Sequence, residues 1–330
     1  MPISIAIGKQ QPVGGMLAVA HANTPYFDIY DIDSGTDTFT KRTPPVNLPS
    51  NDGFGIDFSS DNTYLAFAGG LVPKVYKGSP YVKLTDPASM NGGGSSVKFS
   101  NNDDYLVYTV PASPAVYIYK RAGDTFTKLD NPASLPTLGY DSSFSPDDIY
   151  LAVADAVTPF IHIYKRAGDV FTKLSNPSTL PPSSVACCEF SPDGTYLAVG
   201  GSNSSPRLNI YKRSGDTFTK LANPAGMPTS NVGSITWSSD GIYLAMITAS
   251  SPYFLVFKRD GDNFTLLSTP VGIAALSCDF SADDTYLAMG QAASPYISIY
   301  KRSGDIFTEL TDPLSAAPSG RCDGVVFSNI

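Results

Sequence analysis

A unit of roughly 45 residues recurs along the whole chain. In its clearest copy, the turn Ser-Pro-Asp-Gly at 191–194 separates two apolar segments, residues 185–190 and 196–199. Proline at the second position and glycine at the left-handed position are typical of a tight turn between paired strands. A second turn, Gly215-Asp216, follows in the same way. One unit therefore predicts four short strands, named a, b, c and d in chain order.

The copies are regular enough to predict the architecture. An aromatic residue closes strand a at intervals of 41 to 47 residues, at Phe58, Phe99, Phe144, Phe190, Trp237, Phe280 and Phe327. Strand b begins with Tyr-Leu-Ala or a close variant in most copies. This period is that of a four-stranded propeller blade. We expect an all-β fold, a seven-bladed β-propeller with antiparallel blades, forming a single domain over residues 1–330.

The two ends of the chain predict how the ring closes. The first blade begins at strand b near Met16, and the chain ends on a strand a at 322–328 with no strand after it. We expect this C-terminal strand to complete the first blade. Residues 3–7 also alternate like a strand and are the alternative. The Phe-Ser at 327–328, shared with other copies, favours the C-terminus.

The sequence Phe-Ser-Pro-Asp-Gly-Thr-Tyr-Leu-Ala at 190–198 resembles WD40-like seven-bladed propellers, and the resemblance covers nearly the whole chain. The family's Gly-His before strand a is missing, and Tyr-Lys-Arg at 211–213 stands where Trp-Asp ends strand c. The His–Asp relay of WD40 blades is therefore not expected. Such repeats are similar to those of WD40-like proteins of tailed phages and bacteria, which implies a phage virion component.

Composition narrows the partners and the location. The net charge of −8 argues against nucleic acid, because phosphate binding needs concentrated lysine and arginine. No apolar run is long enough for membrane insertion, and residues 1–8 do not read as a signal peptide. Only 16% of residues are charged, which suits a surface within an assembly or outside the cell. We expect a virion or extracellular location after cytoplasmic synthesis.

Lys-Arg pairs recur at the end of strand c, as at Lys212-Arg213, and each is followed by an aspartate three positions after the arginine. We expect these charges to pair across their own hairpin.

Signatures of catalysis are scarce. The P-loop, G-x-S-x-G, H-E-x-x-H and C-x-x-C patterns are missing, and His21 and His162 are the only histidines. Propeller lactonases need clustered acidic and histidine ligands, which no loop supplies. We therefore expect a protein that is not an enzyme.

The position before the aromatic of strand a predicts a ring around the propeller axis. It holds Asp57, Lys98, Ser143, Glu189, Thr236, Asp279 and Val326. One interpretation is a site for an ion or a small polar ligand. The other is a solvated channel wall with a pair between Lys98 and Asp57.

The first c–d hairpin carries Asp31, Asp33 and Asp37 around Gly35. Oxygen ligands at alternate positions resemble half of a Ca²⁺ loop, although the distal glutamate is missing. A Ca²⁺ site and a bare acidic turn are both open, and no other cofactor is expected.

Large apolar residues recur at one position of the loop after strand d, at Leu48, Met90, Leu135, Leu180 and Met227. They either cap their own blades or, with Tyr26, form a partner-binding face. We expect a non-enzymatic structural or adhesion propeller, a capsid decoration or a tail- or fibre-associated protein, docking on a capsid or tail protein. A carbohydrate- or receptor-binding propeller that recognises a surface glycan is the alternative, followed by an intracellular scaffold.

Overall fold

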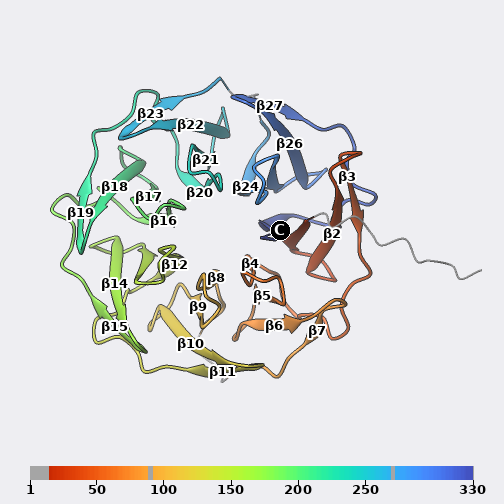
Figure 1. Ribbon diagram of the computed structural model, residues 1–330, viewed down its shortest axis with the longest axis horizontal. Coiled ribbons are helices and arrows are strands. Elements are labelled where there is room, and N and C mark those ends of the chain that lie inside the picture. Colours follow the sequence, from red (N-terminus) through yellow and green to blue (C-terminus); the bar gives the residue numbers. More distant parts are fainter. Residues whose placement is uncertain (1–14, 88–91, 269–271, 330) are drawn as a thin grey trace, which may run out of the picture.

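The computed structural model describes residues 15–87, 92–268 and 272–329. Within these ranges the chain forms 28 strands, gathered into seven four-stranded sheets that stand as blades around a central axis (Figure 1). The predicted all-β, seven-bladed propeller is confirmed. Among the described residues there is no helix of the length and apolarity that a membrane crossing requires.

Each blade runs from the axis outward. The innermost strands are β4 (Gly55–Phe58), β8 (Ser96–Phe99), β12 (Gly139–Phe144), β16 (Val185–Phe190), β20 (Val232–Trp237), β24 (Ala275–Phe280) and β28 (Cys322–Phe327). The second strands are β1 (Met16–His21), β5 (Tyr64–Ala68), β9 (Tyr105–Thr109), β13 (Tyr150–Asp155), β17 (Tyr196–Gly201), β21 (Tyr243–Thr248) and β25 (Tyr286–Gln291).

The outer half of each blade follows the same order. The third strands are β2 (Phe27–Asp33), β6 (Lys74–Lys77), β10 (Val116–Ala122), β14 (Ile161–Ala167), β18 (Leu208–Ser214), β22 (Phe254–Asp260) and β26 (Ile297–Ser303). The outermost are β3 (Thr38–Lys41), β7 (Val82–Lys83), β11 (Thr125–Lys128), β15 (Val170–Lys173), β19 (Thr217–Lys220), β23 (Asn263–Leu266) and β27 (Ile306–Glu309).

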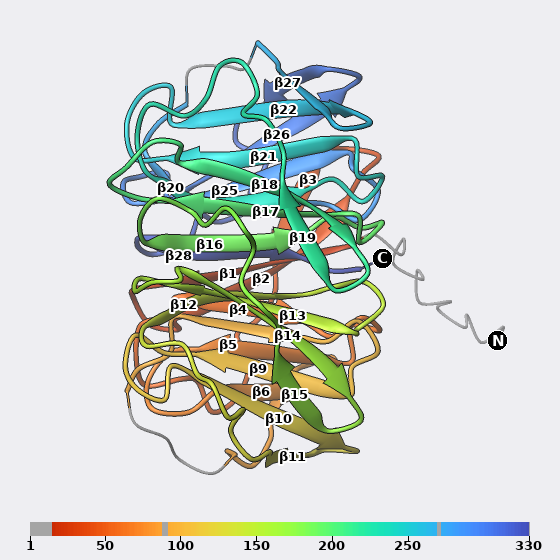
Figure 2. The same cartoon turned by 90° about the vertical axis from the view of Figure 1, so that its left-hand side faces the viewer.

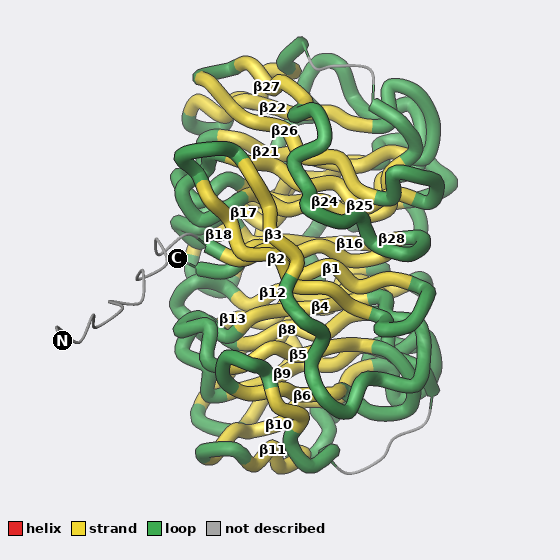
Figure 3. Tube along the Cα trace, turned by 90° about the vertical axis from the view of Figure 1, so that its right-hand side faces the viewer, coloured by secondary structure: helices red, strands yellow, loops and turns green. Residues whose placement is uncertain are grey.

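The ring closes through its C-terminal strand. β28 pairs antiparallel with β1, with Leu17 opposite Phe327 and Val19 opposite Val325. The two strands lie side by side in Figures 2 and 3. The Met16 amide also donates a hydrogen bond to Ser328 Oγ, at 2.7 Å. This confirms the predicted closure, while the alternative strand at residues 3–7 lies outside the described residues.

The hydrophobic core lies between neighbouring blades. The second strand of a blade is buried on both of its faces, as in β17, and side chains of adjacent blades share one cluster. Tyr196 meets Phe264 of the next blade edge to face, with ring centroids 5.8 Å apart. Such offset aromatic contacts add to the free energy of burying the rings. Each blade therefore depends on the next one for its core.

Charged contacts tie the outer parts of the blades together. The phenol of Tyr196 donates a hydrogen bond to Asp262 in the c–d hairpin of the next blade, and Lys212 Nζ lies 2.8 Å from the same carboxylate. We call such a group an interblade clamp. In the described residues it recurs as Tyr64/Lys77–Asp124, Tyr105/Lys120–Asp169, Tyr150/Lys165–Asp216, Tyr243/Lys258–Asp305 and Tyr286/Lys301–Asp37.

The prediction that each lysine pairs across its own hairpin is therefore wrong. Alternate side chains of a strand point to opposite faces of the sheet, and Lys212 lies on the face that meets the neighbouring blade. Its arginine neighbour, Arg213, lies instead over the ring of Tyr150.

Candidate functional site

The channel along the propeller axis widens into a cavity of about 430 Å³. Six of the seven positions predicted to ring the axis line it: Asp57, Lys98, Ser143, Glu189, Asp279 and Val326. The seventh, Thr236, donates a hydrogen bond to Asp279 at 3.2 Å. These side chains face the axis because each stands one residue before an aromatic side chain that points between the blades.

The mouth of this axial cavity is built from the turns between the first and second strands. Ser60, Asn101 and Ser239 contribute polar groups there, and Asn329, which follows β28, adds another. The turns are held by aspartates of neighbouring blades: the Ser60 amide and hydroxyl both donate to Asp103, at 2.8 and 2.7 Å. The cavity therefore opens on the face of the molecule that carries these turns, and we call the hydrogen-bonded residues around its mouth the rim.

One interaction fixes the polar side chains of the ring. At four of the ring positions, the side chain before the aromatic accepts a hydrogen bond from the backbone amide of the corresponding aromatic in the next blade. The amide of Phe99 donates to Asp57 at 2.7 Å, and that of Phe327 donates to Asp279 at 2.7 Å. Longer versions join Trp237 to Glu189 and Phe190 to Ser143, at 3.2 and 3.1 Å. Carboxylates at these positions are thus oriented before any ligand arrives.

Lys98 is the one cation among the described residues that line the axial cavity. Its Nζ lies 3.6 Å from Asp57 Oδ1, which confirms the predicted pair. Burial alone would lower the pKa of Lys98, but the surrounding carboxylates, led by Asp57, raise it above its usual value. The lysine therefore stays charged at neutral pH.

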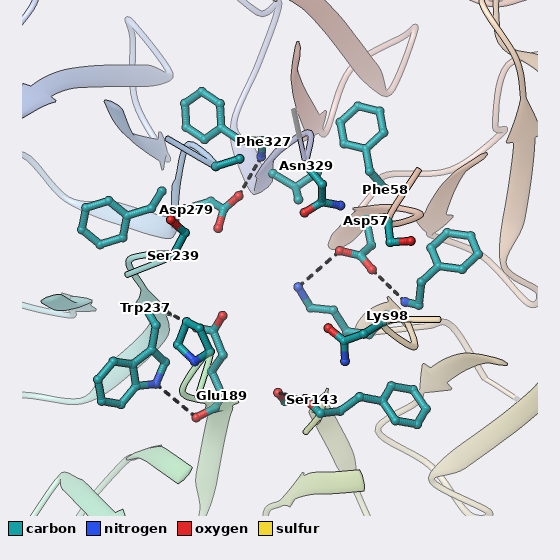
Figure 4. A pocket seen from close by; sticks show the side chains of 18 of the residues that line it. Asp57, Phe58, Lys98, Ser143, Glu189, Trp237, Ser239, Asp279, Phe327 and Asn329 are labelled. Atoms are coloured by element: carbon teal, nitrogen blue, oxygen red, sulfur yellow. Dashed lines mark hydrogen bonds and ion pairs between the residues drawn. The ribbon is translucent and has the colours of Figure 1, made fainter. Parts of the chain in front are cut away.

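The carboxyl groups across the axial cavity both have raised pKa values. Burial raises the pKa of Asp279 to about 6, although the Phe327 amide and Lys98 oppose the shift. Burial raises the pKa of Glu189 well above its usual value. In Figure 4, Lys98 points into the cavity from one side, and Glu189 and Asp279 approach from the other. A ligand on the axis would thus meet one cation and two carboxyl groups whose pKa values burial raises.

The opposite mouth of the channel forms a smaller cavity of about 150 Å³, whose lining includes Tyr140, Asp141 and Asp323. Asp141 accepts hydrogen bonds from Ser96 Oγ at 2.9 Å and from the Cys188 amide at 3.1 Å. Burial raises its pKa too. Negative charge therefore surrounds Lys98 on both sides along the axis.

The carboxylates of the proposed Ca²⁺ loop face different partners. Asp31 pairs with Arg42, Asp33 accepts the Gly35 amide at 2.9 Å, and Asp37 belongs to the clamp with Lys301. Within residues 15–87, 92–268 and 272–329, no three His, Cys, Asp or Glu side chains are grouped so as to hold a metal ion. The hairpin offers an ion no gathered ligands, and Ca²⁺ binding there stays a prediction.

Two His–Asp pairs were not predicted. His21 Nε2 lies 3.2 Å from Asp28, and His162 Nε2 lies 3.1 Å from Asp155. In both blades one partner ends the second strand and the other is the second residue of the third strand, in opposite order. That spacing was the sequence signal for them. All four side chains are buried and lie outside the axial cavity.

Of the predicted partner-binding residues, those that the structure describes lie on the face opposite the mouth of the axial cavity, on the loops between blades and between the second and third strands. Leu135, Met227 and Tyr26 are half-buried and pack against the interblade cores. Leu48 and Leu180 are also half-buried, and Met90 lies outside the described residues. Binding of a protein or a glycan by this face stays a prediction.

Comparison with known proteins places the fold. The WD40 family model, described as WD domain, G-beta repeat, matches residues 176–208. No curated protein matches the sequence. Two solved structures, from Bacteroides uniformis and Bacteroides fragilis, are named provisionally as 6-phosphogluconolactonases. The first has 14% identity and a TM-score of 0.78, covering 95% of this chain and 99% of its own. The second has 12% identity and a TM-score of 0.76, covering 95% and 97%.

A third structure is the periplasmic gluconolactonase PpgL of Pseudomonas aeruginosa, with 15% identity and a TM-score of 0.72, covering 95% of this chain and 99% of its own.

These names contradict the expectations of a phage structural or adhesion protein and of a protein that is not an enzyme. Catalytic sequence motifs did not reveal the residues of the axial cavity, because each polar residue of the axial ring comes from a different blade. At these identities the likeness shows the fold. The chain is a seven-bladed β-propeller in which residues 176–208 match the WD40 repeat model.

Proposed function

We propose that the chain is a hydrolase that opens small lactones in its axial cavity. The observation that carries the proposal is that Lys98, Glu189 and Asp279 line one cavity, in which burial raises the pKa of both carboxyl groups. With a pKa of about 6, Asp279 is largely ionised at neutral pH, and burial raises the pKa of Glu189 well above its usual value. Two carboxyl groups with raised pKa values beside a cation suit general acid–base catalysis, and we assign Asp279 as the base and Glu189 as the acid.

The proposed reaction uses water as the nucleophile. Asp279 takes a proton from water, and the water oxygen bonds to the lactone carbonyl carbon. The carbonyl oxygen gains the negative charge and faces the ammonium group of Lys98, which stabilises it. The ring carbon–oxygen bond then breaks, and the ring oxygen receives the proton of Glu189. The proton held by Asp279 restores Glu189, and the new carboxylic acid ionises, so each turnover releases one proton to solvent.

The neighbours' names support this reaction class and no other detail of it. Gluconolactonase and 6-phosphogluconolactonase are both names of lactone-hydrolysing proteins. The Tyr-Lys-Arg that replaces Trp-Asp in the repeats supports a further proposal about descent alone, a common origin with the WD40-like repeats of tailed phages and bacteria.

The test is proton release during hydrolysis of glucono-δ-lactone, followed by pH-stat titration. The wild-type protein should exceed the uncatalysed rate, and Asp279→Asn should lower kcat by about 10²–10⁴-fold, the usual contribution of a general base. Asp216→Asn, which changes an interblade clamp outside the axial cavity, is the matched control and should keep the wild-type rate. No acceleration by the wild type, or equal rates for Asp279→Asn and wild type, would overturn the proposal.

A further inference from the structure

The axial cavity carries an excess of negative charge. Even with Glu189 protonated, as the proposed reaction requires, Asp57 and Asp279 line it and Asp141 lies deeper in the channel, against Lys98 as the single cation among the described lining residues. That lysine is already 3.6 Å from Asp57. Proteins hold phosphate groups with several cationic or amide donors, arginine forks above all. A phosphorylated ligand would find one shared lysine and a surplus of like charge.

The rim has its hydrogen-bond donors turned away from the cavity. The hydroxyl groups of Ser60 and Ser239 donate to Asp103 and Asp284, at 2.7 and 2.9 Å. The amide group of Asn101 donates to Ser145 O at 2.9 Å.

The Asn329 amide is turned away in the same manner, donating to Ser59 O at 3.3 Å. What the rim can offer a ligand is therefore mainly oxygen lone pairs. Such a wall suits a ligand that brings its own donors, as a sugar brings hydroxyl groups.

We infer that the substrates of this site are uncharged, polyhydroxylated lactones, and that the site rejects their phosphate esters. The inference rests on the proposed lactone hydrolysis and adds its substrate class. The acceptor-rich rim binds the hydroxyl groups, and the ammonium group of Lys98, which has three N–H donors and one ion-pair partner at 3.6 Å, can also face a neutral carbonyl oxygen. The same negative charge repels the carboxylate product, so it favours product release.

The experiment compares kcat/KM for glucono-δ-lactone and its 6-phosphate with the full-length protein. The neutral lactone should be preferred by about tenfold or more, because like charges in an interface are strongly unfavourable. Equal values, or preference for the phosphate ester, would overturn the inference and leave the hydrolase proposal standing. If neither lactone is hydrolysed, the hydrolase proposal fails. Calorimetric binding of the corresponding lactams, with and without phosphate, then decides the inference by the same preference.

A charge variant tests the cause of the preference. Ser143 stands between Lys98 and Glu189 in the order of blades, and Ser143→Lys adds a second cation to the ring. The preference for the neutral lactone should shrink, whereas Ser143→Met, of similar length without charge, should retain it. Melting curves show whether both variants are folded. An unchanged ratio in folded Ser143→Lys would overturn the electrostatic explanation.

Discussion

Lys98 of one blade and Asp57 of the preceding blade form an ion pair on the propeller axis, with 3.6 Å between nitrogen and oxygen. The pair lies in a ring that also holds Glu189 and Asp279. Lys98 is thus shared by several carboxyl groups, and none of them is neutralised by a cation of its own. This imbalance makes the ring suited to proton transfer, and it costs folding stability when the carboxyl groups ionise.

The hydrolysis rate should depend on pH with a bell-shaped profile. kcat/KM should rise through about pH 6 as Asp279 loses its proton and becomes the base. It should fall at higher pH as Glu189, whose pKa burial raises, loses the proton that the leaving oxygen needs. Glu189→Gln should lower the rate and remove the alkaline limb. A profile that stays flat through pH 6 would contradict the role of Asp279.

Thermal stability should be greatest on the acid side of neutrality. Burial raises the pKa of Asp279 from 3.8 to about 6, so its contribution to the free energy of unfolding is fully present below pH 3.8 and is lost as the pH rises through about 6. Asp57, Asp141 and Glu189 shift in the same direction through burial.

The pKa of Asp193, in the turn at 191–194, shifts in the opposite direction. Despite burial, hydrogen bonds from Ser191, Arg259 and the Thr195 amide lower the pKa of Asp193 to about 2. Its contribution is present above the unfolded value of 3.8 and is lost as the pH falls through about 2. Melting temperature measured against pH should therefore peak between about pH 4 and pH 6. As a control, Asp279→Asn should raise stability at pH 8 by on the order of 2 kcal/mol while reducing activity. A steady rise of melting temperature from pH 5 to pH 8 would contradict this account.

The interblade clamp should contribute through its tyrosine more than through its lysine. Tyr196→Phe removes the hydroxyl group that donates to Asp262 while the ring keeps its contact with Phe264, and it should lower the melting temperature measurably. Lys212→Met should have the smaller effect, because both partners of that pair are nearly half exposed. High salt should weaken only the lysine contribution. A larger loss from Lys212→Met than from Tyr196→Phe would refute this ranking.

Closure of the ring should depend on the last strand. Deletion of residues 322–330 removes β28, leaves the edge of β1 unpaired and takes the Phe327 amide from Asp279. We expect aggregation or loss of cooperative unfolding, measured by light scattering and calorimetry. Removal of residues 1–9 is the matched control and should leave unfolding cooperative. The reverse pattern would mean that the N-terminal segment closes the ring.

Much of the fold could be predicted because short sequence patterns that repeat along the chain determine it. The turn at 191–194 and the aromatic period fixed the blades, and the unpaired strand at 322–328 indicated the closure. The ring of axial positions followed from counting one residue back from each aromatic. These inferences need only the alternation of strand side chains and a constant period.

The contacts between blades could not be predicted in the same way. Lys212 reaches Asp262, 50 residues away, and the packing of neighbouring blades decides this pairing. The site was misjudged for a related reason. Lys98, Glu189 and Asp279 come from three blades, so no local spacing marks them, and the strong shift of the two carboxyl pKa values arises from burial that only the closed ring creates.

In the proposed reaction the charge of Lys98 stabilises the oxyanion in the axial cavity, and Lys98→Met removes that charge. Proton release from glucono-δ-lactone should fall by about 10²–10³-fold in this variant, the usual cost of removing a group that stabilises an oxyanion. Lys165→Met, which removes the lysine of an interblade clamp outside the cavity, should keep the wild-type rate. Melting curves should show that both variants are folded. A folded Lys98→Met protein that hydrolyses the lactone as fast as the wild type would contradict the account.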